Sequence, residues 1–275
     1  MGLRIGRIAV SLLMWAVAAI MFVPFFWMIS SSFKPSADVF SYPVEWIPEQ
    51  WTLNGYKALF DSKYNFVRFY LNTFIVAFMT VVGVVTVGSM TAYAYAKIKF
   101  KGREFFFILL VATIAVPFQT VMIPLFIIFR NLGLLDTLTS QWIGAFINPV
   151  TAIFLLRQFF KSVHDELIES AKMDGCSHLR ILWQIVMPIA RPVLFTVVLI
   201  YFVSSWNNYE AALLFIRSLD NYVVSIAVKI FSGEMSMNHS ATMAASTISI
   251  VPLMFLLVTG QKYLISGLTA GAVKG

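Results

Sequence analysis

The sequence has few charged side chains and almost no cysteine. Charged residues make up 12% of the 275 residues and hydrophobic residues 59%, whereas about a quarter of the residues of a soluble domain are charged. This balance excludes an ordinary soluble domain and predicts an integral membrane protein. The single cysteine, Cys176, excludes an internal disulfide, and we interpret it as a small residue in a tight place rather than a reactive thiol.

The usual signatures of catalysis are also missing. The sequence has no Gly-x-x-x-x-Gly-Lys-Ser/Thr loop, so the chain does not itself cradle the phosphates of ATP in the usual way. It has no His-Glu-x-x-His, no cysteine pair and no Gly-x-Ser-x-Gly. Its three histidines, His164, His178 and His239, are scattered. We therefore expect no metal site, no cofactor and no enzymatic activity in this chain.

Long apolar segments dominate what is present. No charge occurs between Arg7 and Lys34, and this run is longer than the apolar region of a signal peptide, so we interpret it as a retained span. Pro117 and Pro124 predict a break in the third span. We expect an all-α polytopic membrane protein, one permease-like domain over residues 1–275, with six transmembrane helices at approximately 8–31, 69–96, 105–129, 139–160, 192–215 and 241–264.

The basic residues indicate the topology. The net charge is +7. Most of the Lys and Arg residues lie in the chain ends and in every second connection between spans, which the positive-inside rule places in the cytoplasm. The bias is clearest in the short loop that holds Lys97, Lys99, Lys101 and Arg103. Both termini are therefore predicted to be cytoplasmic. The basic residues need no nucleic acid to explain them.

The longest regularly charged stretch covers residues 162–191. Acids come early in its first half and Lys172 later, at helical spacing. Asp174 and Gly175 predict a break, and a second apolar helical pattern follows until Pro188 and Pro192 close it. The pattern predicts a cytoplasmic helix-turn-helix that exposes small residues and an acid to another protein.

These residues carry a resemblance. Glu169-Ser170-Ala171, then Asp174-Gly175, then Met187-Pro188 resembles the EAA loop of ABC importer permeases, with Ser170 in place of an alanine and Met187 in place of a leucine. Ser205 to Phe215 and the ending Ile265 to Gly275 are similar to the second permease subunit of maltose-type carbohydrate importers. The resemblance implies a permease in the bacterial cytoplasmic membrane that imports a carbohydrate, favouring a di- or oligosaccharide.

The resemblance also implies partners and contact residues. The partners are a second homologous permease, two ATP-binding cassette ATPases that hydrolyse the ATP, and an extracellular solute-binding protein. The expected ATPase-coupling residues are Glu169, Ser170, Ala171, Asp174, Gly175 and Pro188. The tail would make a second contact with the ATPases through Gly267, Gly271 and Lys274. In related permeases the region of residues 231–246 touches the binding protein; the residues alone fit a plain loop equally well.

The pathway for the cargo must be polar within the spans. The candidate residues are Trp206, Asn207, Tyr209, Glu210, Gln119 and Asn148, because aromatic rings suit sugar rings and polar groups suit hydroxyls. Trp206 and Glu210 would share a face of the fifth helix. The same polar groups could instead join neighbouring helices.

Two other classes of protein remain open. One is an ion-coupled secondary carrier that works alone, for which Glu210 is the candidate ionisable group. It would predict uptake that survives loss of the ATPase. The other is a structural or assembly protein of the membrane without a substrate.

Overall fold

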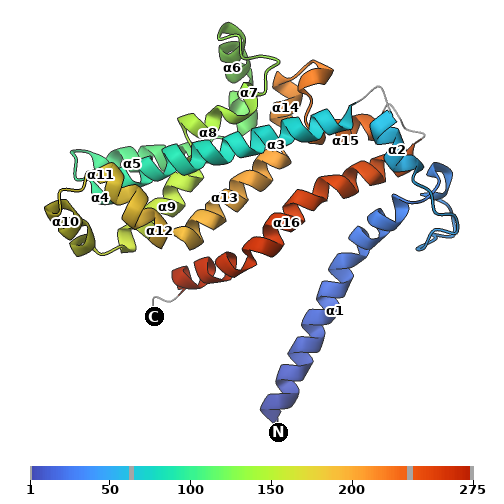
Figure 1. Ribbon diagram of the computed structural model, residues 1–275, viewed down its shortest axis with the longest axis horizontal. Coiled ribbons are helices and arrows are strands. Elements are labelled where there is room, and N and C mark those ends of the chain that lie inside the picture. The colour runs from blue at the N-terminus through green and yellow to red at the C-terminus, as the bar shows by residue number, and fades with distance from the viewer. Residues whose placement is uncertain (1, 62–64, 234–237, 273–275) are drawn as a thin grey trace. The chain divides into compact units, whose positions relative to one another are not determined.

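The computed structural model describes residues 2–61, 65–233 and 238–272, and within these ranges all regular structure is helical (Figure 1). This confirms the predicted all-α class. The chain divides into two compact units. One contains residues 1–67 and 227–251, and the other contains residues 68–226 and 252–275.

The first unit contains a long apolar helix and an ordered loop. Its elements are α1 (Gly2–Ser31), η1 (Ser36–Asp38), α2 (Asn54–Asp61) and the first half of α16 (His239–Ala272). In the loop the side chain of Lys34 is buried and donates a hydrogen bond to the carbonyl of Glu45. The hydroxyls of Ser32 and Tyr56 lie 2.8 Å apart. These bonds order the loop that follows α1.

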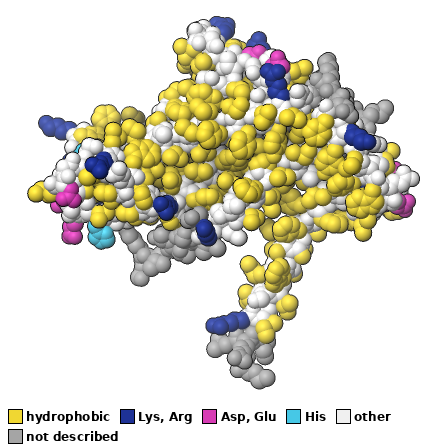
Figure 2. Space-filling model, viewed as in Figure 1, with side chains coloured by type: hydrophobic (Ala, Val, Ile, Leu, Met, Phe, Trp, Pro, Cys, Tyr) yellow, Lys and Arg dark blue, Asp and Glu magenta, His cyan; other side chains and the backbone are white. Residues whose placement is uncertain are grey.

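Helix α1 has the composition of a membrane span, but its own chain covers little of it apart from its carboxyl end, where Ser30 and Ser31 are buried. Residues Gly6–Ser31 have a mean hydropathy of 2.4, and 0% of the tested window is buried. Trp15 and Leu12, for example, are 76% and 65% exposed. Figure 2 shows hydrophobic side chains along its length. A helix that is apolar on all sides needs lipid or another protein around it.

The second unit contains the remaining helices. In chain order they are α3 (Phe66–Gly83), η2 (Val84–Gly88), α4 (Ser89–Lys97), α5 (Arg103–Ala112), η3 (Thr113–Ala115), α6 (Phe118–Asn131), α7 (Thr139–Trp142), α8 (Gly144–Ile147), α9 (Val150–Ser162), α10 (Asp165–Met173), α11 (His178–Ile181), η4 (Leu182–Val186), α12 (Met187–Ile189), α13 (Arg191–Trp206), α14 (Glu210–Phe215), η5 (Leu219–Asn221) and α15 (Val224–Gly233), which continues into the first unit. The second half of α16 completes it.

Three of the predicted spans correspond to long helices. Gly6–Ser31, Phe66–Lys97 and His239–Lys262 are each long and apolar enough to cross a membrane. Within the described residues two bent helix pairs could each form a further span, which brings the number to as many as five. One of these pairs, Arg103–Ala115 with Phe118–Asn131, bends by 100°. The bend lies at Pro117, where a break is predicted; Val116 before it is extended, as a residue before proline prefers.

Two predicted spans are less continuous than expected. The structure divides the predicted fourth span, residues 139–160, into α7, α8 and α9. Asn148, with φ −149° and ψ 71°, and Pro149 separate the last two of these helices. In the predicted fifth span, residues 192–215, α13 ends at Trp206 and α14 begins at Glu210. Both segments are therefore broken helices, and the six spans with these bounds remain a prediction.

The core of the second unit lies mainly between α4 and α9. Ala92, Ile153 and Leu156 are fully or almost fully buried in it. Close helix approach depends on small residues: a Cβ on Gly83 would lie 2.5 Å from the ring of Phe146. The buried guanidinium of Arg157 is balanced by both carboxylate oxygens of Glu104, each 2.6 Å from Nη2.

Candidate functional site

Residues 162–191 form the predicted helix-turn-helix. The first helix, α10, has Asp165 and Glu166 in its first turn and Lys172 in its last. These charges complement the helix dipole, which favours acids at the amino end and bases at the carboxyl end. The second helical run covers α11, η4 and α12 without interruption from His178 to Ile189.

The prolines of this second run act differently from the prediction. Pro188 lies inside the run, in α12, and does not end it. Pro192 lies in the first turn of α13, where a missing N–H costs little. The bend between the two runs is 88°. It falls at Ala190, between the two prolines.

The turn after α10 is a Schellman motif. The amide of Cys176 donates to the carbonyl of Ala171 at 3.0 Å, and the amide of Gly175 donates to Lys172 at 2.9 Å. Gly175 has a φ of +79°, a conformation that side chains other than glycine adopt at a cost. This confirms the predicted helix break at Asp174 and Gly175. A Cβ on Gly175 would have no neighbour within 4 Å, so the turn presents an open surface.

The two faces of α10 differ in exposure. Glu169, Ser170, Asp174 and Gly175 are exposed, and so is Pro188 on α12. Ala171, by contrast, is only 6% exposed and belongs to the buried cluster of the core, together with Ile168 and Ile181. The expectation that the side chain of Ala171 itself contacts a partner is therefore corrected: its small size lets α10 pack on the second run.

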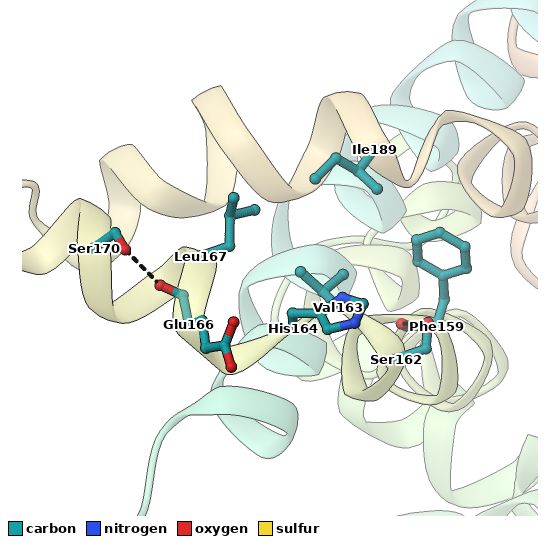
Figure 3. A pocket seen from close by; sticks show the side chains of 8 residues that line it. All are labelled: Phe159, Ser162, Val163, His164, Glu166, Leu167, Ser170 and Ile189. Carbon is teal, nitrogen blue, oxygen red and sulfur yellow. Dashed lines mark hydrogen bonds between the residues drawn. The ribbon is translucent and has the colours of Figure 1, made fainter.

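A pocket opens beside the exposed face of α10. Its volume is about 480 Å³, and its walls come from α9, α10, α12 and the residues between α9 and α10. Leu167 and Ser170 project from α10 and Ile189 from α12 (Figure 3). The hydroxyl of Ser170 donates to the carbonyl of Glu166 at 2.8 Å. Apolar side chains next to acidic ones would fit a protein surface better than a small polar ligand.

Two polar contacts join the loop to α4. Nζ of Lys97 lies 2.6 Å from Oδ1 of Asp165 and 2.5 Å from the carbonyl oxygen of Val163. The hydroxyl of Tyr93 lies 3.1 Å from Nδ1 of His178. The hydrogen bond from the Lys97 ammonium, with its positive charge, holds the pKa of Asp165 below its ordinary value. The sequence signals Lys97 only as a topological charge, and nothing in it points to these pairings.

Some of the predicted pathway residues lie at the breaks in the apolar helices. Gln119 follows the break at Pro117, and Glu210 begins α14 after the break at 207–209. The side-chain amide of Gln119 donates to Oε2 of Glu210 at 2.9 Å. Both side chains are exposed, as is Asn148 at its own break. Irregular backbone at membrane depth is tolerated where it is covered by protein or lines a water-filled cavity.

Asparagine side chains account for the break in the fifth predicted span. Nδ2 of Asn207 donates to the carbonyl of Val203 at 2.9 Å, and Oδ1 of Asn208 accepts from the amide of Ala211 at 3.3 Å. Asparagine competes in this way with helical backbone bonds and caps a new helix. Because the helix breaks between Trp206 and Glu210, the prediction that they share a helix face is wrong.

Trp206 is buried among other aromatic side chains. It is 2% exposed. Its ring stacks on Phe202 at a centroid distance of 5.5 Å and meets Tyr70 edge-on at 5.4 Å. Its neighbours are the aromatic rings of its own chain, and its place in the cargo pathway remains a prediction. Tyr209 is half-buried and Asn207 exposed, so both remain accessible candidates.

Sequence reasoning missed a polar cluster around Asp136, in the loop between α6 and α7. Its Oδ1 accepts from the amides of Arg217 and Ser218 at 3.0 and 2.9 Å and from the Ser218 hydroxyl at 2.9 Å. Burial raises the pKa of Asp136, but the hydrogen bonds from Ser218 and Arg217 outweigh it and leave the pKa below its ordinary value. The sequence offers one signal for this turn, the aspartate three residues after Gly133. Aspartate tolerates the left-handed backbone conformation, and φ at Asp136 is +57°.

The remaining predicted residues lie at the chain end. Gly267 and Gly271 lie within the last turns of α16, which continues to Ala272, so the predicted tail is helical there. Lys274 lies outside the described residues. The described part of the chain contains no group of three or more His, Cys, Asp or Glu side chains arranged to hold a metal ion.

Long broken apolar helices with an exposed helix-turn-helix define a class of membrane transport component. The family model of the binding-protein-dependent transport system inner membrane component matches residues 84–269, which include the whole loop. The chain belongs to this family.

Two curated relatives and one solved structure align along nearly the whole chain. An arabinooligosaccharides transport system permease protein, AraQ, of Halalkalibacterium halodurans is 31% identical over 94% of this chain and 93% of its own length. A sulfoquinovosyl glycerol transport system permease protein, SmoH, of Agrobacterium fabrum is 31% identical over 92% and 88%. A chain of a bacterial ABC transporter that imports the acidic polysaccharide alginate superposes with a TM-score of 0.78, at 27% identity over 95% and 97% of the two chains.

Proposed function

We propose that this chain is one of two permease subunits of an ABC importer that moves a carbohydrate across the bacterial cytoplasmic membrane. A solute-binding protein would deliver the cargo from outside, and two partner ATPases would drive transport. The observation that carries the proposal is the family match across residues 84–269, supported by relatives named for arabinooligosaccharides and for sulfoquinovosyl glycerol. Both names describe glycosides, which favours a cargo that contains a glycosidic bond.

The exposed face of α10 and the turn that follows it form the proposed ATPase contact. Glu169, Ser170, Asp174 and Gly175 form its surface, and the turn at Gly175 leaves open space for a partner. Exposed Met173, at 89%, and Leu167, at 43%, add apolar area beside the acids. A protein interface commonly combines such an apolar centre with a polar rim. Pro188 is exposed on the neighbouring run, and Gly267, Gly271 and Lys274 are proposed to make a second contact.

The proposed cargo pathway is assembled from the helix breaks. Gln119, Asn148, Asn207 and Glu210 are exposed side chains at or beside these breaks, and Tyr209 supplies an accessible ring. Amide and carboxylate groups can replace the water that hydrates sugar hydroxyls. The hydrogen bond between Gln119 and Glu210 holds the carboxylate by one oxygen and leaves the other available.

The proposed orientation places both termini and the helix-turn-helix in the cytoplasm. The basic residues of the 97–103 loop support it through the positive-inside rule, and so does the need for α10 to meet a cytoplasmic ATPase. The loop around Asp136 would then lie outside, where the binding protein docks. Residues 231–246 are proposed for the same contact, and those at 234–237 lie outside the described residues.

The experiment that tests the function is co-purification from the native membrane, comparing wild type with Gly175→Asp and Gly175→Ala. Both variants place a side chain at φ +79°, a conformation that aspartate adopts at no greater cost than alanine, but only aspartate adds a charge to the proposed contact surface. We expect an ATPase and a second permease to accompany the wild type, and the ATPase to be lost from Gly175→Asp and retained by Gly175→Ala. If wild type purifies alone, or if uptake survives deletion of the ATPase, an independent carrier replaces the importer.

A further inference from the structure

Two buried side chains of α4 hold the two arms of the helix-turn-helix, Lys97 on the α10 arm and Tyr93 on the α11 arm. We infer that they are positioning residues that transmit the movement of this loop to the span formed by α3, η2 and α4. The inference rests on the proposed function, because it assigns the element of this chain that responds when an ATPase moves the loop. Figure 1 shows α4, α10 and α11 together at one end of the second unit.

The first contact holds the beginning of α10. The side chain of Lys97 is only 4% exposed, whereas that of Asp165 is 78% exposed. The ammonium bonds both to the Asp165 carboxylate, at 2.6 Å, and to the carbonyl of Val163, at 2.5 Å. Because the lysine is enclosed and binds the backbone as well as a side chain, a shift of the amino end of α10 must displace Lys97 or break both bonds.

The second contact holds the beginning of α11. The buried Tyr93 places its hydroxyl 3.1 Å from Nδ1 of His178, and the two rings meet edge-on at 5.8 Å. His178 is the first residue of α11. The Schellman turn joins α11 to α10, so the two contacts hold the loop on either side of the proposed ATPase surface.

The two contacts lie on one face of α4. Tyr93 and Lys97 are four residues apart, which places their side chains one above the other along the helix. Two attachment points one turn apart resist rotation as well as translation of the loop relative to α4. A single contact would leave the loop free to pivot about it.

The attachment leads along a continuous helix to the polar breaks. Residues Phe66–Lys97 form one unbroken candidate span. At its middle the hydroxyl of Thr80 lies 3.3 Å from that of Ser205 on α13. Ser205 comes two residues before the break that separates α13 from α14 and Glu210. A displacement of α4 can therefore reach the proposed cargo pathway along this helix and through the contact between Thr80 and Ser205.

Apolar packing is the competing route. Ile168, Ala171 and Ile181 join the loop to the same core as Tyr93, and that packing alone could carry the loop's movement. The polar contacts can be removed with little change of packing: Lys97→Met keeps the length of the side chain, Tyr93→Phe keeps the ring, and Asp165→Asn alters an exposed group. Lys101→Met is the matched control, since Lys101 is an exposed lysine of the same basic loop.

The experiment uses the complete importer reconstituted in proteoliposomes with its cargo-loaded binding protein. Uptake and ATP hydrolysis are measured in the same sample, and their ratio is the readout. We expect Lys97→Met and Tyr93→Phe to lower the transport per ATP by about fivefold or more, the lower end of typical coupling between sites. We expect Asp165→Asn to lower it by less, because Lys97 keeps its bond to Val163, and Lys101→Met to leave it unchanged.

The outcomes separate this inference from the proposed function. If the wild type couples uptake to ATP hydrolysis and Lys97→Met and Tyr93→Phe do so equally well, transmission runs through apolar packing and the inference is wrong. If the wild type shows no ATP-dependent uptake, the proposed function fails instead. Lys97→Arg provides the check on folding: it retains a cation that can reach both acceptors, so it should recover most of the coupling that Lys97→Met loses.

Discussion

Helix α1 and the helix-turn-helix at residues 162–191 contrast in how they are stabilised. The apolar residues of α1 are exposed within the chain, and 0% of its tested window is buried. The helix-turn-helix exposes charged side chains such as Glu169, Lys172 and Asp174 on its outer surface, yet Ile168, Ile181 and Leu182 beneath them are at most 4% exposed. The helix therefore takes its stability from its surroundings in the membrane, whereas the loop takes its shape from its own chain.

This difference explains why the two regions suit different tasks. A helix whose apolar side chains are mostly exposed within its chain can be covered either by lipid or by another subunit. A coupling element must keep its shape while another protein displaces it, which requires internal packing and capped ends. The Schellman turn and the contacts of Lys97 and Tyr93 supply these.

The largest expected effect tests burial directly. Phe160 at the end of α9 is 0% exposed and Phe22 in α1 is 61% exposed. We expect Phe160→Ala to destabilise the folded chain by about 3–5 kcal/mol, the usual cost of emptying a core site. Phe22→Ala should change the stability in detergent by under about 0.5 kcal/mol, as at other surface sites. Thermal unfolding of the two purified variants is the measurement, and equal losses would remove the contrast between the regions.

The sequence predicts the features that depend on local chemistry. Apolar length predicts α1 and the helix from Phe66 to Lys97, Pro117 predicts the first break, and Asp174-Gly175 predicts the turn of the loop. These succeed because proline geometry, glycine conformations and membrane thickness act over a few residues or along one helix.

The features that the sequence does not predict depend on contacts between distant residues. At the break after Trp206 the side chains of Asn207 and Asn208 bond to the backbone, and asparagine also occurs in unbroken helices. The burial of Ala171 and Trp206 depends on which helices pack beside them. Lys97 pairs with Asp165, 68 positions further along the chain. No pattern in residues 97–103 distinguishes Lys97 from Lys99 or Lys101. Pairings of this kind become visible only in the fold.

A smaller effect comes from comparing two glycines. Gly175 in the turn has a φ of +79°, whereas Gly6 lies in α1, and a Cβ would have no neighbour within 4 Å at either position. Gly175→Ala should cost about 1–2 kcal/mol of local stability because alanine resists the left-handed conformation. Gly6→Ala should stabilise its helix by about 0.5–1 kcal/mol. Hydrogen exchange at residues 171–177 and 3–10 measures the local stability at each site. If both substitutions raised the local stability, or both lowered it, the assigned conformations would be contradicted.

The smallest expected effect concerns acid. Because Lys97 lowers the pKa of Asp165 in the folded chain, this contact stabilises the start of α10 above the unfolded pKa of about 3.9. The stabilisation is lost as the pH falls through the lower folded pKa. Asp165 is largely exposed, so we expect at most about 1 kcal/mol. Hydrogen exchange of α10, corrected for the intrinsic effect of pH, should be constant near neutral pH and rise in acid below about pH 4. Asp165→Asn should abolish that rise while leaving α1 unaffected. An equal rise in the variant would place the acid-sensitive group elsewhere, and the loop's attachment to α4 would then depend on the Val163 carbonyl and on Tyr93 alone.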